Sequence, residues 1–328
     1  MSESSPFDLY AAAGTTLAAR KLGPPFFAMV GDEDPASYLA DDGLCDAINV
    51  ALALGQPLLL TGDPGTGKTR LAGSIAYQLG LLQPLRFDVK TTSAARDLFY
   101  RYDSLLHFHD SQFKEASPPV EKYITYEALG LAILLSKEPQ EANAFLPEHL
   151  RDRGPIRSVV LIDEIDKAPR DLPNDVLNEI ENMSFTVRET GNTFSADARF
   201  RPILVLTSNS EKNLPDAFLR RCVFYHIPFP GRAKLSQIVH RRLGPNPNFT
   251  ATMLDHALRH FEEIRELDLK RRPATAELLA WIHLLRSLGI DVDDLKAGQA
   301  QQLDSSYSVL AKTKDDLDLI KARKRAGT

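Results

Sequence analysis

The chain has 328 residues, of which 43% are hydrophobic and 25% charged, and its formal net charge is −5. This length exceeds what one hydrophobic core usually holds, so we expect a soluble globular protein with a main domain and a smaller one. The negative charge argues against a dominant nucleic-acid-binding field, although a local basic groove is compatible with it.

The cysteines and the start of the chain bear on the compartment. Cys45 and Cys222 are too few for a disulfide framework and fit a reducing cytoplasm, which we expect as the location. The first residues lack a basic segment followed by a long apolar one, and no apolar run reaches about 18 residues. The sequence therefore predicts neither a signal peptide nor a membrane span.

Residues 1–35 are predicted to form an N-terminal extension that ends in a loop, because glycine and proline interrupt them at 23–25 and 31–35. The predicted main domain covers residues 36–229. Within it, a helix over 44–54 leads into an apolar strand that ends at Thr61.

The segment after that strand carries the most specific motif in the chain. It satisfies G-x-x-x-x-G-K-[ST] and precedes an apolar-periodic helix. Glycines let backbone N–H groups surround a β-phosphate at the positive end of that helix. Lys68 would reach the β- and γ-phosphate oxygens, and the Thr69 hydroxyl would ligate Mg²⁺. The predicted nucleotide-binding residues are Gly62, Asp63, Pro64, Gly65, Thr66, Gly67, Lys68, Thr69 and Arg70.

A long insert is predicted after the second strand, which we expect over 85–90. About 70 residues separate it from the next apolar strand, far more than a simple crossover needs. The insert covers about 91–157. It contains the aromatic segment Phe99, Tyr100 and Tyr102 and an apolar helix over 126–135.

Two carboxylates end the buried strand over 158–164. Ligands gather at the carboxyl ends of parallel strands, and strands buried on both faces read as continuous apolar runs. Asp163 is predicted to hold Mg²⁺ through a bound water. Glu164 is then placed to act as general base toward the attacking water.

Another apolar strand, over 203–209, ends in Asn209, whose amide can hold the water or the γ-phosphate. Alternating apolar residues around Gly191 and Asn192 predict a β-hairpin over about 184–201. A basic pair, Arg220 and Arg221, precedes the last strand at 223–228. Residues 230–328 read as helical, with Trp281 on a core face, and form the predicted lid domain.

Strand-end motifs in this order, with a basic pair before a final strand, resemble those of the AAA+ ATPases. The sequences of 163–169 and 214–221 are most similar to the MoxR branch, which is grouped with dynein-related AAA domains. The resemblance spans roughly residue 38 to the C-terminus. It implies an α/β fold, a three-layer αβα sandwich around a five-stranded parallel sheet of order 5-1-4-3-2, with a C-terminal helical lid. Family members carry extra elements where the insert and the hairpin stand here.

The resemblance also implies roles for single residues. Asn209 matches sensor 1. Arg221 matches the arginine finger that reaches the γ-phosphate bound by the next subunit, with Arg220 as the alternative. For sensor 2, Arg272 is the first choice. Arg271, or no sensor 2 at all, remains open, because one alignment puts Thr275 at the expected position.

The function implied is Mg²⁺-dependent ATP hydrolysis in a homo-oligomer, expected to be a hexameric ring, coupled to chaperone-like remodelling of a protein client. A von Willebrand factor A-domain protein is a frequent partner in this branch. The insert aromatics would then either grip the client or form a local core. Two rival functions stay open: a motor or loader acting with nucleic acid in restriction or phage defence, and a slow nucleotide-dependent assembly switch. The sequence alone also leaves GTP open as the nucleotide.

Overall fold

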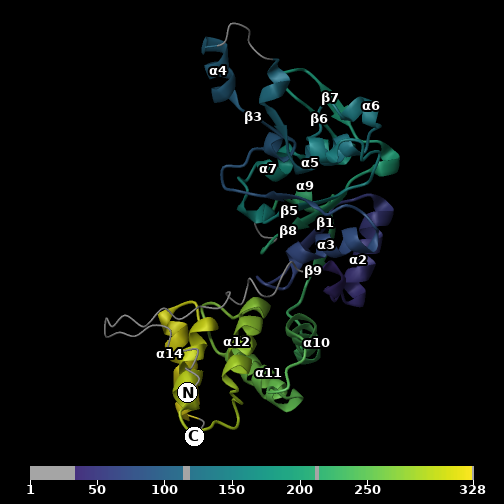
Figure 1. The fold of residues 1–328 in the computed structure, drawn as a ribbon. Coiled ribbons are helices and arrows are strands. Elements are labelled where there is room, and N and C mark those ends of the chain that lie inside the picture. The colour runs from purple at the N-terminus through teal and green to yellow at the C-terminus, as the bar shows by residue number, and fades with distance from the viewer. Residues whose placement is uncertain (1–33, 114–118, 211–213, 327–328) are drawn as a thin grey trace. The chain divides into compact units, whose positions relative to one another are not determined.

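A computed structural model describes residues 34–113, 119–210 and 214–326 (Figure 1). Nearly all of the predicted N-terminal extension, 1–35, lies outside the described residues. Two compact units divide the chain, one from Tyr38 to Pro228 and the other containing the chain from Phe229 onward.

The first unit is built on five parallel strands. In chain order they are β1 (Leu58–Thr61), β2 (Leu85–Asp88), β5 (Val159–Asp163), β8 (Ile203–Thr207) and β9 (Val223–His226). Their order across the sheet is β2-β5-β8-β1-β9, and every neighbouring pair is parallel. Numbered along the chain without the small hairpins, this is the order 5-1-4-3-2. The predicted fold class is therefore confirmed.

Alternate residues of a strand pack in two different hydrophobic cores, because successive side chains point to opposite faces of the sheet. Leu58 and Leu60 pack in one cluster with residues of α2 (Asp42–Leu54) and α3 (Lys68–Gln78). Leu59 packs in another, with residues of α5 (Ala128–Leu135) and α8 (Leu177–Asn182). The sheet is thus covered by helices on both faces, as a three-layer sandwich requires.

The insert between β2 and β5 has its own small sheet. Strands β3 (Tyr100–Tyr102) and β4 (Ile124–Tyr126) pair antiparallel, and α4 (Ser104–Phe113) lies between them in the chain. Helix α5 begins at residue 128 rather than at the predicted 126, because residues 124–126 are held in β4. A Cβ on Gly130 would lie 2.0 Å from the carbonyl oxygen of Phe99, so only glycine allows α5 this close to the insert backbone.

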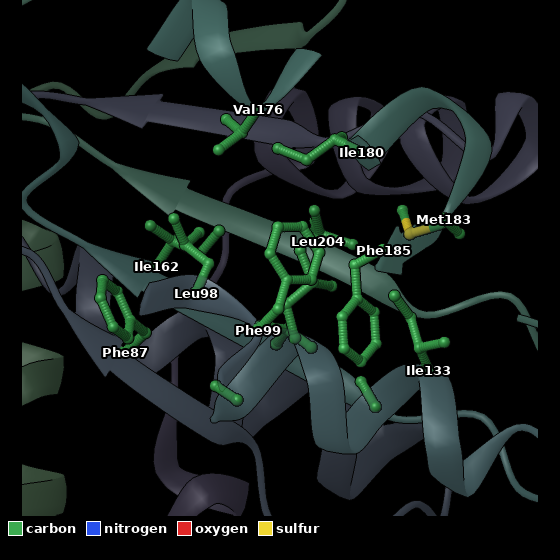
Figure 2. Packing of buried hydrophobic residues seen from close by; sticks show 14 of the residues in the cluster. Phe87, Leu98, Phe99, Ile133, Ile162, Val176, Ile180, Met183, Phe185 and Leu204 are labelled. Carbon is green, nitrogen blue, oxygen red and sulfur yellow. The ribbon is translucent and has the colours of Figure 1, made fainter. Parts of the chain in front are cut away.

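The insert aromatics form core rather than a gripping surface. Phe99 and Tyr100 are only 3% and 2% exposed, and Phe99 stacks on Phe185 with ring centroids 5.1 Å apart (Figure 2). Tyr102 is half-buried and hydrogen-bonds to His107. The prediction of a client contact is wrong for Phe99 and Tyr100, because both rings are buried against the hairpin predicted over 184–201.

That hairpin consists of β6 (Ser184–Thr186) and β7 (Thr193–Ser195), paired antiparallel with Phe185 opposite Phe194. Its turn is closed by Gly191, whose N–H donates to the carbonyl of Val187, and by Val187, whose N–H donates to Asn192. Short helices connect the remaining parts of this unit: α6 (Pro139–Ala142), α7 (Leu172–Asp175) and α9 (Asp216–Leu219).

The second unit is helical, as expected of a lid. Its core surrounds Trp281, which is fully buried and whose indole N–H donates to the Ser306 hydroxyl at 2.8 Å. No helix in the described part of the chain is long and apolar enough to cross a membrane. The helices are α10 (Arg232–Leu243), α11 (Ala251–Glu266), α12 (Thr275–Leu288), α13 (Gln299–Ser306) and α14 (Lys314–Ala326).

Candidate active site

The loop between β1 and α3 has the backbone that a phosphate cradle needs. Gly62, Gly65 and Gly67 have φ angles of 140°, 75° and 91°, a region that residues with a Cβ rarely adopt. A Cβ on Gly62 would lie 2.5 Å from the carbonyl oxygen of Ile227. The loop ends where α3 begins, so the unpaired N–H groups of the helix start face the cradle. The loop therefore fits a triphosphate.

Lys68 lies beneath this loop and is only 7% exposed. Its ammonium donates to the carbonyls of Gly62 at 2.7 Å and Asp63 at 3.0 Å, and to Oδ1 of Asn209 at 3.1 Å. Burial lowers the pKa of Lys68, while nearby carboxylates, Asp166 first, act to raise it. Two predicted site residues far apart in the chain, Lys68 at the start of α3 and Asn209 after β8, are thus in direct contact.

The Thr69 hydroxyl meets the carboxylate at the end of β5. Its Oγ1 donates to Asp163 Oδ1 at 3.1 Å and Oδ2 at 3.3 Å, and Thr207 Oγ1 donates to Oδ1 at 2.5 Å. Asp163 is 6% exposed. A hydroxyl and a carboxylate beside a phosphate cradle are the hard oxygen ligands that Mg²⁺ takes together with nucleotide phosphates. The donor set fits the predicted ion.

Glu164 follows directly in an unusual backbone conformation, with φ 58° and ψ 49°. For a residue with a Cβ this left-handed region costs on the order of 1–2 kcal/mol. The Glu164 N–H donates to Thr207 Oγ1 at 2.9 Å, which anchors the turn. Its side chain is partly exposed and forms an ion pair with Lys167. The carboxylate therefore follows directly after Asp163, one of the two predicted Mg²⁺ ligands, and is held by Lys167.

Asn209 is positioned by the turn after β8. Its backbone N–H donates to Asp166 Oδ1 at 3.3 Å, and its side-chain oxygen accepts from Lys68. The amide is therefore at the same sheet edge as the cradle and the two carboxylates.

One residue at this edge, Arg86, was not predicted from the sequence. Arg86 on β2 donates from Nη2 to Asp163 Oδ2 at 2.9 Å and from Nε to Asp88 Oδ1 at 2.7 Å. Strands β2 and β5 pair in parallel with Asp88 opposite Asp163. The available signal was a charged residue inside a predicted strand, but its target depends on the strand register.

Arg70 is half-buried on the first turn of α3. It lies near Tyr38. Burial raises the pKa of Tyr38, and the positive charge of Arg70 offsets part of that rise. The Tyr38 ring also lies against the loop, since a Cβ on Gly67 would be 3.3 Å from it.

The side-chain partners of Arg221 lie outside the group of residues around the cradle. Arg220 and Arg221 are both exposed just after α9. Arg221 donates from Nη1 to the carbonyl of Ala217 at 3.0 Å and pairs with Glu181 at 3.3 Å. Neither partner belongs to the phosphate-binding group.

Arg271 and Arg272 belong to the helical unit and are exposed ahead of α12. Their assignment to sensor 2 depends on how the helical unit is placed relative to the phosphate loop, so it stays a prediction.

Comparison with known proteins gives one family. A model of the AAA domain, dynein-related subfamily, matches residues 57–222, just over half of the chain. No curated protein matches. Thermotoga maritima RuvB, as a point variant, aligns at 14% identity and TM-score 0.43, covering 81% of this chain and 67% of its own. A katanin structure, solved for its self-assembly, aligns at 15% identity and TM-score 0.40, covering 87% and 82%. The family match includes the cradle, both carboxylates, Asn209 and Arg221.

Proposed function

Because the chain belongs to the dynein-related subfamily of AAA domains, it is an ATPase that uses ATP with Mg²⁺, and we propose that it is of the MoxR-like type. In this proposal a ring of identical subunits couples hydrolysis to the remodelling or activation of a protein partner. The observation that carries the catalytic part is the meeting of Lys68, Asn209, Thr69 and Asp163 at one sheet edge.

In this proposal each of these residues has a separate role in binding or hydrolysis. Loop N–H groups and the Lys68 ammonium bind the β- and γ-phosphates, and Thr69 and Asp163 hold Mg²⁺. The bound ion neutralises charge on the phosphate oxygens. Glu164 accepts the proton of the attacking water, for which it has to leave Lys167, and Asn209 orients that water or the γ-phosphate.

A ring follows from the proposed role of Arg221. The family generally forms oligomeric rings. Arg221 is exposed and its side-chain partners lie outside the group of residues around the cradle, which supports a role toward the next subunit. Arg220 is the second choice for that role, and Arg272 is proposed as sensor 2.

The proposed partner is a protein, with a von Willebrand factor A-domain protein as the first candidate. With Phe99 and Tyr100 buried, the hairpin over 184–201 becomes the client-facing element in this proposal. Several of its residues are exposed, among them Thr186, Arg188 and Thr193. A motor or loader acting with nucleic acid, and a slow assembly switch, are the alternatives.

The test uses Glu164→Gln. Turnover is expected to fall by about two to four orders of magnitude, the range general-base catalysis supplies, while ATP binding is retained. Glu141→Gln is the matched control, since Glu141 is an exposed carboxylate of the same unit that pairs with Lys137. Wild-type turnover in Glu164→Gln would mean that another group is the base.

The ATP-bound Glu164→Gln variant also separates the functional classes. A protein captured by it that then stimulates wild-type turnover supports remodelling. Stimulation by nucleic acid alone supports the motor or loader. Turnover near zero with tightly retained nucleotide in the wild type supports the switch.

A further inference from the structure

Arg86 on β2 places its guanidinium against Asp163, the predicted magnesium carboxylate on the neighbouring strand β5. Its Nη2 lies 2.9 Å from Oδ2, while Thr207 takes Oδ1. The side chain of Asp163 is 9% exposed, so its charge is poorly screened and a nearby cation matters more than at the surface. The ion pair therefore sits at the carboxylate where Mg²⁺ or its water ligands would bind.

Arg86 also has a second anchor. Its Nε pairs with Asp88 at 2.7 Å, and the side chain is 52% exposed, so it can turn toward solvent without losing every partner. The parallel register puts Asp88 directly opposite Asp163. The guanidinium thus bridges two carboxylates, one exposed and one buried, and can give up the buried one.

We propose that Arg86 is an internal counter-ion that competes with Mg²⁺ for Asp163, so that β2 sets part of the magnesium requirement of ATP binding. Without the ion, Arg86 neutralises Asp163 and reduces its repulsion of the triphosphate. With the ion, the guanidinium has to move off Oδ2 and is kept by Asp88. Arg86 acts through Asp163, so it is a positioning residue. This inference rests on the proposed assignment of Thr69 and Asp163 to Mg²⁺.

The test measures the affinity for ATP with excess EDTA and with saturating Mg²⁺, in the Glu164→Gln background so that ATP is not consumed. The dissociation constant in EDTA divided by the dissociation constant in Mg²⁺ reports the coupling between ion and nucleotide. Arg86→Gln should weaken binding in EDTA and strengthen it in Mg²⁺, raising the ratio about tenfold, within the usual span of such couplings. Arg86→Lys keeps the charge and should change it less.

Asp88→Asn should act in the opposite direction, because Arg86 then has only Asp163 to hold and the ratio falls. A purely structural role would lower the melting temperature in both variants and leave both ratios alone. Arg101→Gln is the matched control, since Arg101 also pairs an exposed guanidinium with a mostly buried carboxylate, Glu127, at 2.6 Å.

Asp163→Asn separates failure of the inference from failure of the site assignment. If it abolishes the Mg²⁺ effect while Arg86→Gln leaves the ratio within about twofold, the competition is wrong but the site stands. If it leaves the Mg²⁺ effect intact, the assignment and the inference both fall. Weaker binding of Mg²⁺–ATP in Arg86→Gln would also overturn the proposal. Should Arg86→Gln not fold, a ratio that stays unchanged in Asp88→Asn overturns it alone.

Discussion

The nucleotide edge of the sheet and the insert between β2 and β5 place their side chains in different ways. At the edge, Asp163 ends β5 while Lys68 and Asn209 come after β1 and β8, and parallel strands bring their carboxyl ends together. In the insert, Tyr100 is buried partly by residues of the distant hairpin, among them Phe185, whose ring stacks on it, and Arg188, whose N–H donates to its hydroxyl. A strand end is thus a local property, whereas the burial of an aromatic ring depends on its partner.

The largest expected effect is on the stability of the aromatic core that the insert and the hairpin share. Phe185→Ala should lower the free energy of unfolding by about 3–5 kcal/mol, because it leaves a cavity among Phe99, Tyr100 and Phe194. Phe108→Ala on α4 is the matched control: Phe108 is 66% exposed, so a change within about 0.5 kcal/mol is expected. Denaturant unfolding measures both. Equal losses in the two variants would mean that the Phe185 ring contributes no more to stability than an exposed one.

At the nucleotide edge the expected loss is in binding rather than stability. Lys68→Ala should weaken ATP binding by at least about a hundredfold, since charge-assisted hydrogen bonds are worth about 1.5–3 kcal/mol each. Titration calorimetry measures the affinity. Lys137→Ala, which removes an ion pair with Glu141 in the same unit, should bind normally. Binding retained in Lys68→Ala would mean that the cradle holds phosphate through its backbone alone.

The smallest expected signal comes from mixing two inactive variants. Arg221→Ala subunits keep an intact cradle, and Lys68→Ala subunits keep the finger, so mixed rings should recover a fraction of wild-type turnover. A phosphate-release assay over a series of mixing ratios measures it. Mixed oligomers that remain as inactive as either parent would argue that Arg221 does not act between subunits, and repeating the series with Arg220→Ala would test the alternative.

The sheet and its polar edge could be predicted because both follow from short-range pattern. Apolar strands ending in Asp163 or Asn209 needed no knowledge of the rest of the chain. Arg86 could not be predicted, because its contact depends on β2 pairing with β5 in one register. Tyr100 could not either, because part of its cover comes from β6. The roles of Arg221 and Arg272 stay predictions. The first depends on a neighbouring subunit, and the second depends on how the two units are placed.

The backbone of Glu164 also bears on the stability of the fold. Its backbone at φ 58° is a conformation that glycine adopts freely and glutamate does not. Selection for stability alone would favour glycine there, with a gain on the order of 1 kcal/mol. In the proposed function, the chain gives up about 1 kcal/mol of stability to hold a carboxylate at this position.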